Sequence, residues 1–249
     1  MKTLYERPAT LADCLTHYCP GCGHGIVHRL IAEVIDELGI RGKVIGMAPV
    51  GDAVLLHRYM RIDACEPAHG RTAAVAAAIK RVRPDCVVFS YQGDGDLAAI
   101  GIAETLHAAN RGDPISVFFI NNAVYGMTGG QMAPTTLLNQ RTKTTPTGRD
   151  AAAHGYPVRI CELLATLDAP MYLERVAITT PERIRAARRA VRKSFLTQIE
   201  RNGYSLVELL CACPTYWRMA PIEAVKHLEG TMVQAFPLGV FRDWEEARD

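Results

Sequence analysis

The sequence lacks any long apolar run. No stretch approaches the roughly 20 apolar residues that a membrane-spanning helix needs. Residues Met1 to Asp13 also lack the apolar core of a secretory leader peptide. We therefore expect a cytoplasmic protein without a membrane span.

The sequence also has little excess charge of either sign. Its 249 residues carry a formal net charge of +2, and 22% of them are charged, so composition gives no broad case for nucleic-acid binding. The densest basic stretch, residues 183–193, has a helical pattern. We expect a solvated helix face there, with a docking surface for an acidic partner as the alternative.

No internal repeat, low-complexity segment or clear boundary divides the chain. Hydrophobic residues make up 49% of it, which is enough for one full α/β core. Strand-like apolar runs alternate with helical patterns, and this order predicts an α/β fold with a doubly wound, mostly parallel sheet. We expect a single domain over residues 1–249, with an N-terminal CxxC segment and a C-terminal arm from about residue 214.

The expected elements follow from these patterns. Helices are expected at residues 26–38, 72–82, 161–166, 180–201 and 221–229. Strands are expected at residues 43–48, 86–91, 115–120, 171–178 and 204–210. A loop as long as residues 123–160 is usually functional, so we expect a cofactor or a partner to order it.

The chain is organised around residues 92–131. One apolar run ends in Gly93-Asp94-Gly95-Asp96, a helical pattern follows, and a second apolar run ends in Asn121-Asn122. This is the order of a βαβ unit. Ligands of parallel sheets bind at the carboxyl ends of the strands, so both polar turns are expected at one binding edge.

The residue types at this edge suit a metal ion and a diphosphate. Glycines let the backbone approach a ligand, and the helix expected from about Leu97 directs free N–H groups at a phosphate. Asp94 and Asp96 would repel that phosphate unless a cation lay between them. Asp94, the side-chain oxygen of Asn122 and a carbonyl of the next turn are hard oxygen ligands of the kind that Mg²⁺ prefers. The alternative is an ordinary strand-to-helix turn.

The spacing of these residues resembles a known cofactor motif. Gly-Asp-Gly, then 25 residues, then Asn-Asn, followed by VYGMTGGQ, is similar to the thiamine diphosphate (ThDP) motif of ThDP-dependent enzymes. The resemblance implies Mg²⁺ ligation by the side chains of Asp94 and Asn122 and the carbonyl of Val124. It also implies that five neighbouring residues line the diphosphate: Gly93, Gly95, Asp96, Gly126 and Met127.

Eight cysteines in a cytoplasmic chain are not expected to form disulfides. Cys19-Pro-Gly-Cys22 opens a helical pattern and has three interpretations: a redox pair, half of a zinc site with nearby histidines, or part of an iron–sulfur site. Cys213 follows the last core strand and precedes a proline, so it is a candidate for a further thiolate. The cysteines in apolar patterns are expected in the core: Cys65, Cys86, Cys161 and Cys211.

Six motifs together resemble one enzyme family. CPGCGHG, VIGMAPVG, EPAHGR, YQGDGDLAAIG, NNAVYGMTGGQMAPTT and LLCACPTYW occur in the order found in β subunits of 2-oxoacid:ferredoxin oxidoreductases, over roughly residues 15–220. The resemblance implies bound ThDP, Mg²⁺ and one [4Fe–4S] cluster, with Cys19, Cys22 and Cys213 matching three of its ligands. It implies further cofactor contacts from these residues: Met47, Ala48, Pro49, Val50 and His69.

The fourth cysteine of that family's pattern is missing. The turn after the first strand reads Ala48-Pro49-Val50-Gly51-Asp52. Proline cannot ligate iron, whereas a carboxylate can, so we expect Asp52 as the fourth ligand. A three-iron cluster, Cys65 as a substitute ligand, and the absence of a cluster are the alternatives.

The resemblance also implies a reaction and partners. The chain would be the β subunit in a CoA-dependent oxidative decarboxylation of a 2-oxoacid, with electrons passing through the cluster to ferredoxin. An α subunit, with or without a γ subunit, would supply the glutamate that activates ThDP, because this chain holds only the diphosphate half of the site.

The expected substrate is 2-oxoglutarate, with Arg58, Arg61, Lys143 or the partner as the cation for its second carboxylate. Branched-chain and aryl 2-oxoacids are the alternatives. Two other functions stay open: a subunit of a non-oxidative ThDP-dependent decarboxylase, and a non-catalytic electron-transfer or scaffold subunit.

Overall fold

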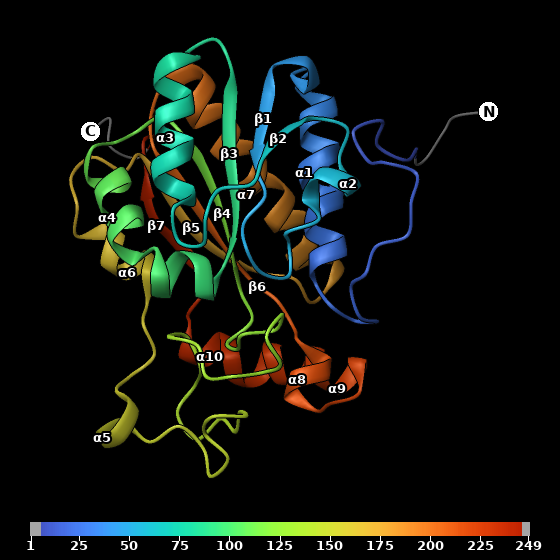
Figure 1. Ribbon diagram of the computed structural model, residues 1–249, viewed down its shortest axis with the longest axis vertical. Coiled ribbons are helices and arrows are strands. Elements are labelled where there is room, and N and C mark those ends of the chain that lie inside the picture. The colour runs from blue at the N-terminus through green and yellow to red at the C-terminus, as the bar shows by residue number, and fades with distance from the viewer. Residues whose placement is uncertain (1–5, 246–249) are drawn as a thin grey trace.

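A seven-stranded sheet lies at the centre of the computed structural model, which describes residues 6–245 (Figure 1). The strands are β1 (Val44–Met47), β2 (Asp63–Cys65), β3 (Val87–Gly93), β4 (Ser116–Asn121), β5 (Tyr172–Ala177), β6 (Ser205–Leu210) and β7 (Gly239–Asp243). Their order is β2-β1-β3-β4-β6-β5-β7, and every pair is parallel except β5 and β7. The expected mostly parallel α/β sheet is confirmed.

Two helical layers cover the sheet. Helices α1 (His24–Glu37) and α7 (Pro181–Arg201) pack on one face, and α3 (Thr72–Val82), α4 (Ile102–Asn110) and α6 (Ile160–Ala165) pack on the other (Figure 1). The bounds of α1, α3, α6 and α7 lie within two residues of the prediction, and α4 belongs to the helix expected from about Leu97. No helix within residues 6–245 is long and apolar enough to cross a membrane.

The remaining helical segments are short and lie mostly in the connections. They are η1 (Arg41–Lys43), α2 (Leu56–Tyr59), η2 (Gly95–Ile100), α5 (Ala151–His154), α8 (Pro214–Trp217), α9 (Pro221–His227), η3 (Leu228–Met232) and α10 (Val233–Ala235).

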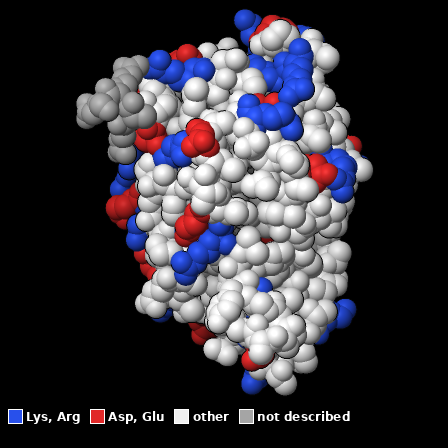
Figure 2. Space-filling view, turned by 90° about the vertical axis from the view of Figure 1, so that its left-hand side faces the viewer, with Lys and Arg blue, Asp and Glu red and all other residues white. Residues whose placement is uncertain are grey.

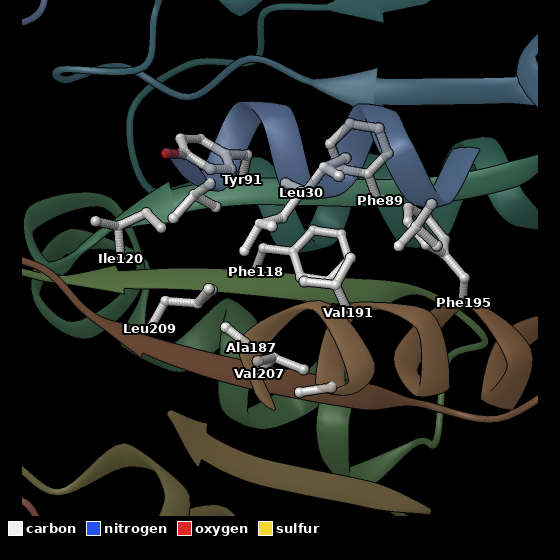
Figure 3. Packing of buried hydrophobic residues seen from close by; sticks show 14 of the residues in the cluster. Leu30, Phe89, Tyr91, Phe118, Ile120, Ala187, Val191, Phe195, Val207 and Leu209 are labelled. Atoms are coloured by element: carbon white, nitrogen blue, oxygen red, sulfur yellow. The ribbon is translucent and has the colours of Figure 1, made fainter. Parts of the chain in front are cut away.

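Aromatic side chains fill the core between the sheet and α7. The ring centroids of Phe89 and Phe118 are 5.7 Å apart, and those of Phe118 and Phe195 are 5.3 Å apart (Figure 3). All three side chains are fully buried, and the tilted and edge-on contacts are those that aromatic rings prefer. This packing fixes β3 and β4, whose carboxyl ends carry the two polar turns.

The basic stretch of residues 183–193 lies on α7 and pairs partly with acidic residues of α1. Arg188 contacts Glu33 at 3.2 Å and Glu37 at 2.6 Å, and Arg192 contacts Glu37 at 2.8 Å. These side chains are partly exposed, so each pair contributes on the order of 0.5 kcal/mol. The expected helix face is present, and its charge is partly compensated within the chain.

The C-terminal arm covers the carboxyl ends of the central strands. Its apolar side chains pack with the loop after β4 in a third buried cluster, which includes Ala123, Leu137, Leu228 and Phe236. The chain then returns to the sheet as β7, which was not expected and pairs antiparallel with β5. Residues 1–5 and 246–249 of the expected 1–249 domain lie outside the described residues. The single-domain organisation stays a prediction, supported by the one sheet.

Candidate functional site

A cavity of about 420 Å³ opens at the carboxyl ends of β1, β3 and β4. Most of the residues predicted to contact the cofactor line it: Pro49, Val50, His69, Gly93, Gly95, Asp96, Gly126 and Met127. Met47 and Ala48 do not line it, because their side chains are fully buried in the apolar clusters on the two faces of the sheet. The geometry therefore gives these two side chains no direct contact with a ligand in this cavity.

The structure brings the three predicted Mg²⁺ ligands together. Asp94 and Asn122 line the cavity, and the backbone N–H of Val124 lies 3.2 Å from Asp94 Oδ2 and 3.3 Å from Asn122 Oδ1. Asp94 is 4% exposed, and burial raises its pKa to about 7. A carboxylate in such a place needs a compensating cation to stay ionised near neutral pH. These donors fit Mg²⁺.

Hydrogen bonds to the Asp96 carboxylate connect the turn after β3 with the segment that leads into α3. Its Oδ1 accepts hydrogen bonds from His69 Nδ1 and the Gly70 N–H, both at 2.7 Å. Its Oδ2 accepts bonds from Thr72 and Gln92, also at 2.7 Å. With its carboxylate engaged by four donors, Asp96 orients the other residues of the cavity. Because Asp96 engages Nδ1 of His69, Nε2 is the ring nitrogen that is available to a ligand.

The helical segment after the acidic turn starts earlier than expected and is irregular. It begins at Gly95 as the π-helical η2, whereas the sequence predicted a start near Leu97, and it continues through Gly101 into α4. A Cβ built on Gly101 would lie 2.3 Å from the Asp96 carbonyl and 2.7 Å from the Gly70 carbonyl. Only glycine permits this close approach, which places the η2 backbone against the His69 loop.

Two residues that sequence reasoning missed hold the long loop after β4. Thr135 Oγ1 donates to Asp94 Oδ2 at 2.9 Å. Arg149 is 4% exposed and donates to six backbone carbonyls, which belong to Ala133, Pro134, Thr136, His154, Gly155 and Tyr156. The loop is therefore ordered by its own arginine, and it delivers one hydroxyl to the predicted metal ligand.

The predicted cluster ligands surround a second, smaller pocket. Cys19, Cys22, Cys213 and Asp52 all line this pocket of about 60 Å³, and Asp52 also lines the larger cavity. Burial, with a smaller contribution from the nearby Asp52 carboxylate, raises the pKa of Cys22 to about 11 and that of Cys213 to about 12. Three thiols and a carboxyl group share this pocket. All four would be negatively charged as ligands, so they would repel one another unless a positive centre lay between them.

No metal site of this kind is preformed in the described part of the chain. Within residues 6–245, no group of three or more His, Cys, Asp or Glu side chains, the four predicted cluster ligands included, is arranged to hold a metal ion. Cys86, Cys161 and Cys211 are buried in the apolar clusters, as expected, and Cys65 packs against one of them. The geometry therefore does not support Cys65 as a substitute cluster ligand.

His24 is a cavity residue to which the sequence analysis gave no role of its own. It lines the larger cavity, its Nδ1 lies 2.7 Å from the Tyr91 hydroxyl, and its ring stacks on Tyr18. Burial lowers its pKa to about 3, so it is neutral at physiological pH. The sequence signals were its place in the CPGCGHG motif, two residues after Cys22, and among the histidines near a possible zinc site.

Comparisons with known proteins agree with this geometry. Residues 51–209 match the protein family described as "Thiamine pyrophosphate enzyme, C-terminal TPP binding domain". The ketoisovalerate oxidoreductase subunit VorA of Methanothermobacter thermautotrophicus is 50% identical over 98% of this chain and 51% of its own length. The 2-oxoglutarate synthase subunit KorB of Archaeoglobus fulgidus is 31% identical over 97% of this chain and 90% of its own length.

A solved structure shares the fold. The 2-oxoglutarate:ferredoxin oxidoreductase from Magnetococcus marinus, determined with 2-oxoglutarate, coenzyme A and succinyl-CoA bound, superposes with a TM-score of 0.76 at 22% identity, over 97% of this chain and 86% of that one. The chain spans about half the length of the VorA relative. It belongs to the thiamine pyrophosphate enzymes and, among them, to the subunits of 2-oxoacid:ferredoxin oxidoreductases.

Proposed function

We propose that the chain acts as the ThDP-binding β subunit in the CoA-dependent oxidative decarboxylation of a 2-oxoacid. The observation that carries this proposal is the convergence of Asp94, Asn122 and the Val124 backbone on one cavity. These are hard oxygen donors next to glycine-rich backbone, which is the combination that a metal-bound diphosphate requires.

The chain's own residues would bind and orient the cofactor. Asp94, Asn122 and the Val124 carbonyl would hold Mg²⁺, while the backbone at Gly95 and Nε2 of His69 would face the diphosphate. When bound, ThDP supplies the carbon nucleophile for the 2-oxoacid carbonyl and the electron sink for loss of CO₂. The activating glutamate is assigned to the partner subunit, because this chain contributes the diphosphate half.

The smaller pocket would hold the iron–sulfur cluster through Cys19, Cys22, Cys213 and Asp52. The pocket that these four residues share supports this ligand set. A cluster there would accept electrons one at a time next to the ThDP cavity. Its test is the iron and sulfide content of anaerobically prepared complex: the proposal expects about four iron atoms per chain and a paramagnetic signal on reduction.

The missing fourth cysteine favours one rival function. A non-oxidative ThDP-dependent decarboxylase subunit needs no cluster and would keep the Asp94–Asn122 site. In that case the purified complex would be colourless, would contain no iron, and would release aldehyde without reducing ferredoxin. A brown complex that reduces ferredoxin only when 2-oxoacid and CoA are both present would exclude this alternative.

The cavity lining supports a substrate other than the expected 2-oxoglutarate. Among the described residues, no lysine or arginine lines the cavity, and Arg58, Arg61 and Lys143 all lie outside it. Apolar side chains contribute instead, including Val50, Ile100 and Met127. We therefore propose a branched-chain aliphatic 2-oxoacid, in agreement with the ketoisovalerate that names the VorA relative.

The open side of the cavity is a suitable surface for the partner subunit. Ile100 is 52% exposed and Met127 is 48% exposed at the rim, and Tyr156 of the long loop is 71% exposed. The lower half of the face in Figure 2, toward the carboxyl ends of the strands in Figure 1, carries few charged side chains. Exposed apolar groups of this kind are typical of interfaces between subunits.

Steady-state rates across a panel of 2-oxoacids test the proposed function. The purified complex would be assayed with ThDP, Mg²⁺, CoA and ferredoxin, and the proposal expects the highest kcat/KM for 2-oxoisovalerate and its homologues. The isolated chain should be inactive under the same conditions. Turnover by the isolated chain, or a complex that is fastest with 2-oxoglutarate, would contradict the partner or the substrate proposal respectively.

A further inference from the structure

A buried ion pair lies in the sheet behind the metal-binding turn. Arg175 on β5 and Glu208 on β6 are directly paired in register, and Arg175 Nε donates to Glu208 Oε2 at 2.8 Å. Neither side chain is exposed. The guanidinium also donates to Glu162 and to the Pro237 carbonyl, so all of its sides are engaged.

The second oxygen of Glu208 fixes the orientation of Asn121. Asn121 Nδ2 donates to Glu208 Oε1 at 2.8 Å, so the amide oxygen must point the other way. That oxygen accepts the backbone N–H of Ala123 at 3.1 Å. A flipped amide would bring its oxygen against the carboxylate and turn its NH₂ group toward the N–H, which are two repulsive contacts. The ion pair therefore selects one orientation of this side chain.

The bond to Ala123 holds an unfavourable backbone conformation. Ala123 has a φ of +58°, in the left-handed region that residues with a Cβ seldom adopt. The residues on either side of it, Asn122 and Val124, carry the side chain and the carbonyl proposed for Mg²⁺. The hydrogen bond to Asn121 therefore stabilises the backbone conformation of Ala123, and this conformation determines the relative orientation of Asn122 and Val124.

Stability alone does not account for the ion pair. A buried ion pair is often no more stable than apolar residues of the same volume, because both charges lose their hydration. Parallel strands with both faces covered are usually filled with aliphatic residues, and the neighbouring Leu206, Val207 and Leu209 follow that rule. Charge at positions 175 and 208 therefore calls for a role that aliphatic side chains would not perform.

We propose that the Arg175–Glu208 ion pair acts through Asn121 as a positioning device for the Mg²⁺-diphosphate turn. Glu208 and Asn121 are positioning residues, since neither lines the cavity. The inference rests on the proposed ThDP–Mg²⁺ site and deepens it. Outer groups that orient metal ligands typically change metal affinity by about 10- to 100-fold when they are altered, although they never touch the metal.

The test measures Mg²⁺ affinity in the assembled complex by calorimetric titration at saturating ThDP, without any turnover. Glu208→Gln removes the charge and lets either end of the amide face Asn121, so we expect Mg²⁺ binding to weaken about 10- to 100-fold. Glu162→Gln is the matched control, because it removes the other carboxylate on Arg175 and leaves the contact to Asn121 in place. We expect unchanged Mg²⁺ affinity in this control.

Asn121→Ala provides a second route if Glu208→Gln does not fold. It removes the bond to Ala123 without placing a new charge in the core. Because both substitutions act through the same contact, the double variant Glu208→Gln/Asn121→Ala should bind Mg²⁺ no more weakly than the weaker-binding single variant. Equal affinities in wild type, Glu208→Gln and Asn121→Ala would overturn the inference and leave the proposed function standing. A wild-type complex that binds neither ThDP nor Mg²⁺ would instead refute the proposed function.

Discussion

The carboxylate of Asp52 occupies the space that a side chain at position 126 would need. A Cβ built on Gly126 would lie 2.2 Å from Asp52 Oδ2, closer than any real contact. Both residues line the larger cavity and the smaller pocket that contains the cysteines. The absence of a side chain at Gly126 therefore lets one carboxylate stand between the two proposed cofactor sites.

Gly126→Ala should displace this carboxylate without removing it. The expected result is loss of one iron from the cluster, detected in the complex as the paramagnetic signal of an oxidised three-iron cluster after brief exposure to air. Asp52→Cys should give a cluster that resists this loss, because it restores a fourth thiolate. Gly25→Ala is the control, since a Cβ at Gly25 meets nothing within 4 Å. An intact cluster in Gly126→Ala would argue against Asp52 as a ligand.

Arg149 should control cofactor affinity at a distance. Replacing it with methionine leaves six backbone carbonyls of the loop without their donor, and we expect a loss of stability on the order of 3 kcal/mol. Residues 132–156 should then become sensitive to proteolysis, and Mg²⁺ should bind more weakly because Thr135 no longer holds Asp94. Saturating ThDP and Mg²⁺ should restore resistance to proteolysis, whereas the lower Mg²⁺ affinity should persist.

Thr135→Val tests the contact of the Thr135 hydroxyl without disturbing the order of the loop. The substitution keeps the shape of the side chain but removes the donor to Asp94, so Mg²⁺ affinity should fall while resistance to proteolysis stays at the wild-type level. Limited trypsin digestion alongside calorimetric titration checks both expectations. Wild-type Mg²⁺ affinity in Thr135→Val would show that the loop does not act through this bond.

His28 should make the folded chain sensitive to acid. Burial, with smaller contributions from His24 and His17, lowers its pKa to about 3, while the unfolded chain keeps the ordinary value of about 6.5. Between these values the unfolded state binds more protons, so stability falls as the pH drops below 6.5, by up to about 1.4 kcal/mol per pH unit for this group. His28→Gln should flatten the pH dependence of the thermal unfolding midpoint.

His57→Gln is the matched control for this titration, because His57 is exposed on α2. Its unfolding midpoint should follow the wild-type curve from pH 7 to pH 4. If His28→Gln and His57→Gln show the same slope, acid sensitivity comes from other groups and the account of His28 is wrong.

Sequence patterns predicted the elements that depend on local periodicity. The bounds of α3 match the expected residues 72–82, and α7 begins after Thr180, whose hydroxyl caps the Arg183 N–H at 3.3 Å. The strand β7 was missed because its residues have no alternating pattern of their own. It forms because β5 offers a free edge, and Arg175 packs against the Phe241 ring at 4.9 Å.

The candidate site was predictable where one motif carries it and hidden where the fold assembles it. Asp94 and Asn122 follow their strands directly, so the sequence alone placed them at one edge. Thr135 and Arg149 lie in a loop without periodicity, and nothing in their spacing points to Asp94. The contact between Arg175 and Glu208 depends on strand order and register, which pair residues 33 positions apart in sequence.

The proposed function requires this chain to hold Mg²⁺ and the diphosphate of ThDP between the turns after β3 and β4. The most direct test is a crystal structure of the complex grown with ThDP and Mn²⁺ in place of Mg²⁺, with anomalous scattering used to locate the metal. We expect one anomalous peak in contact with Asp94, Asn122 and the Val124 carbonyl, and loss of that peak in Asp94→Asn. Bound ThDP with its metal elsewhere, or an unchanged peak in the variant, would contradict it.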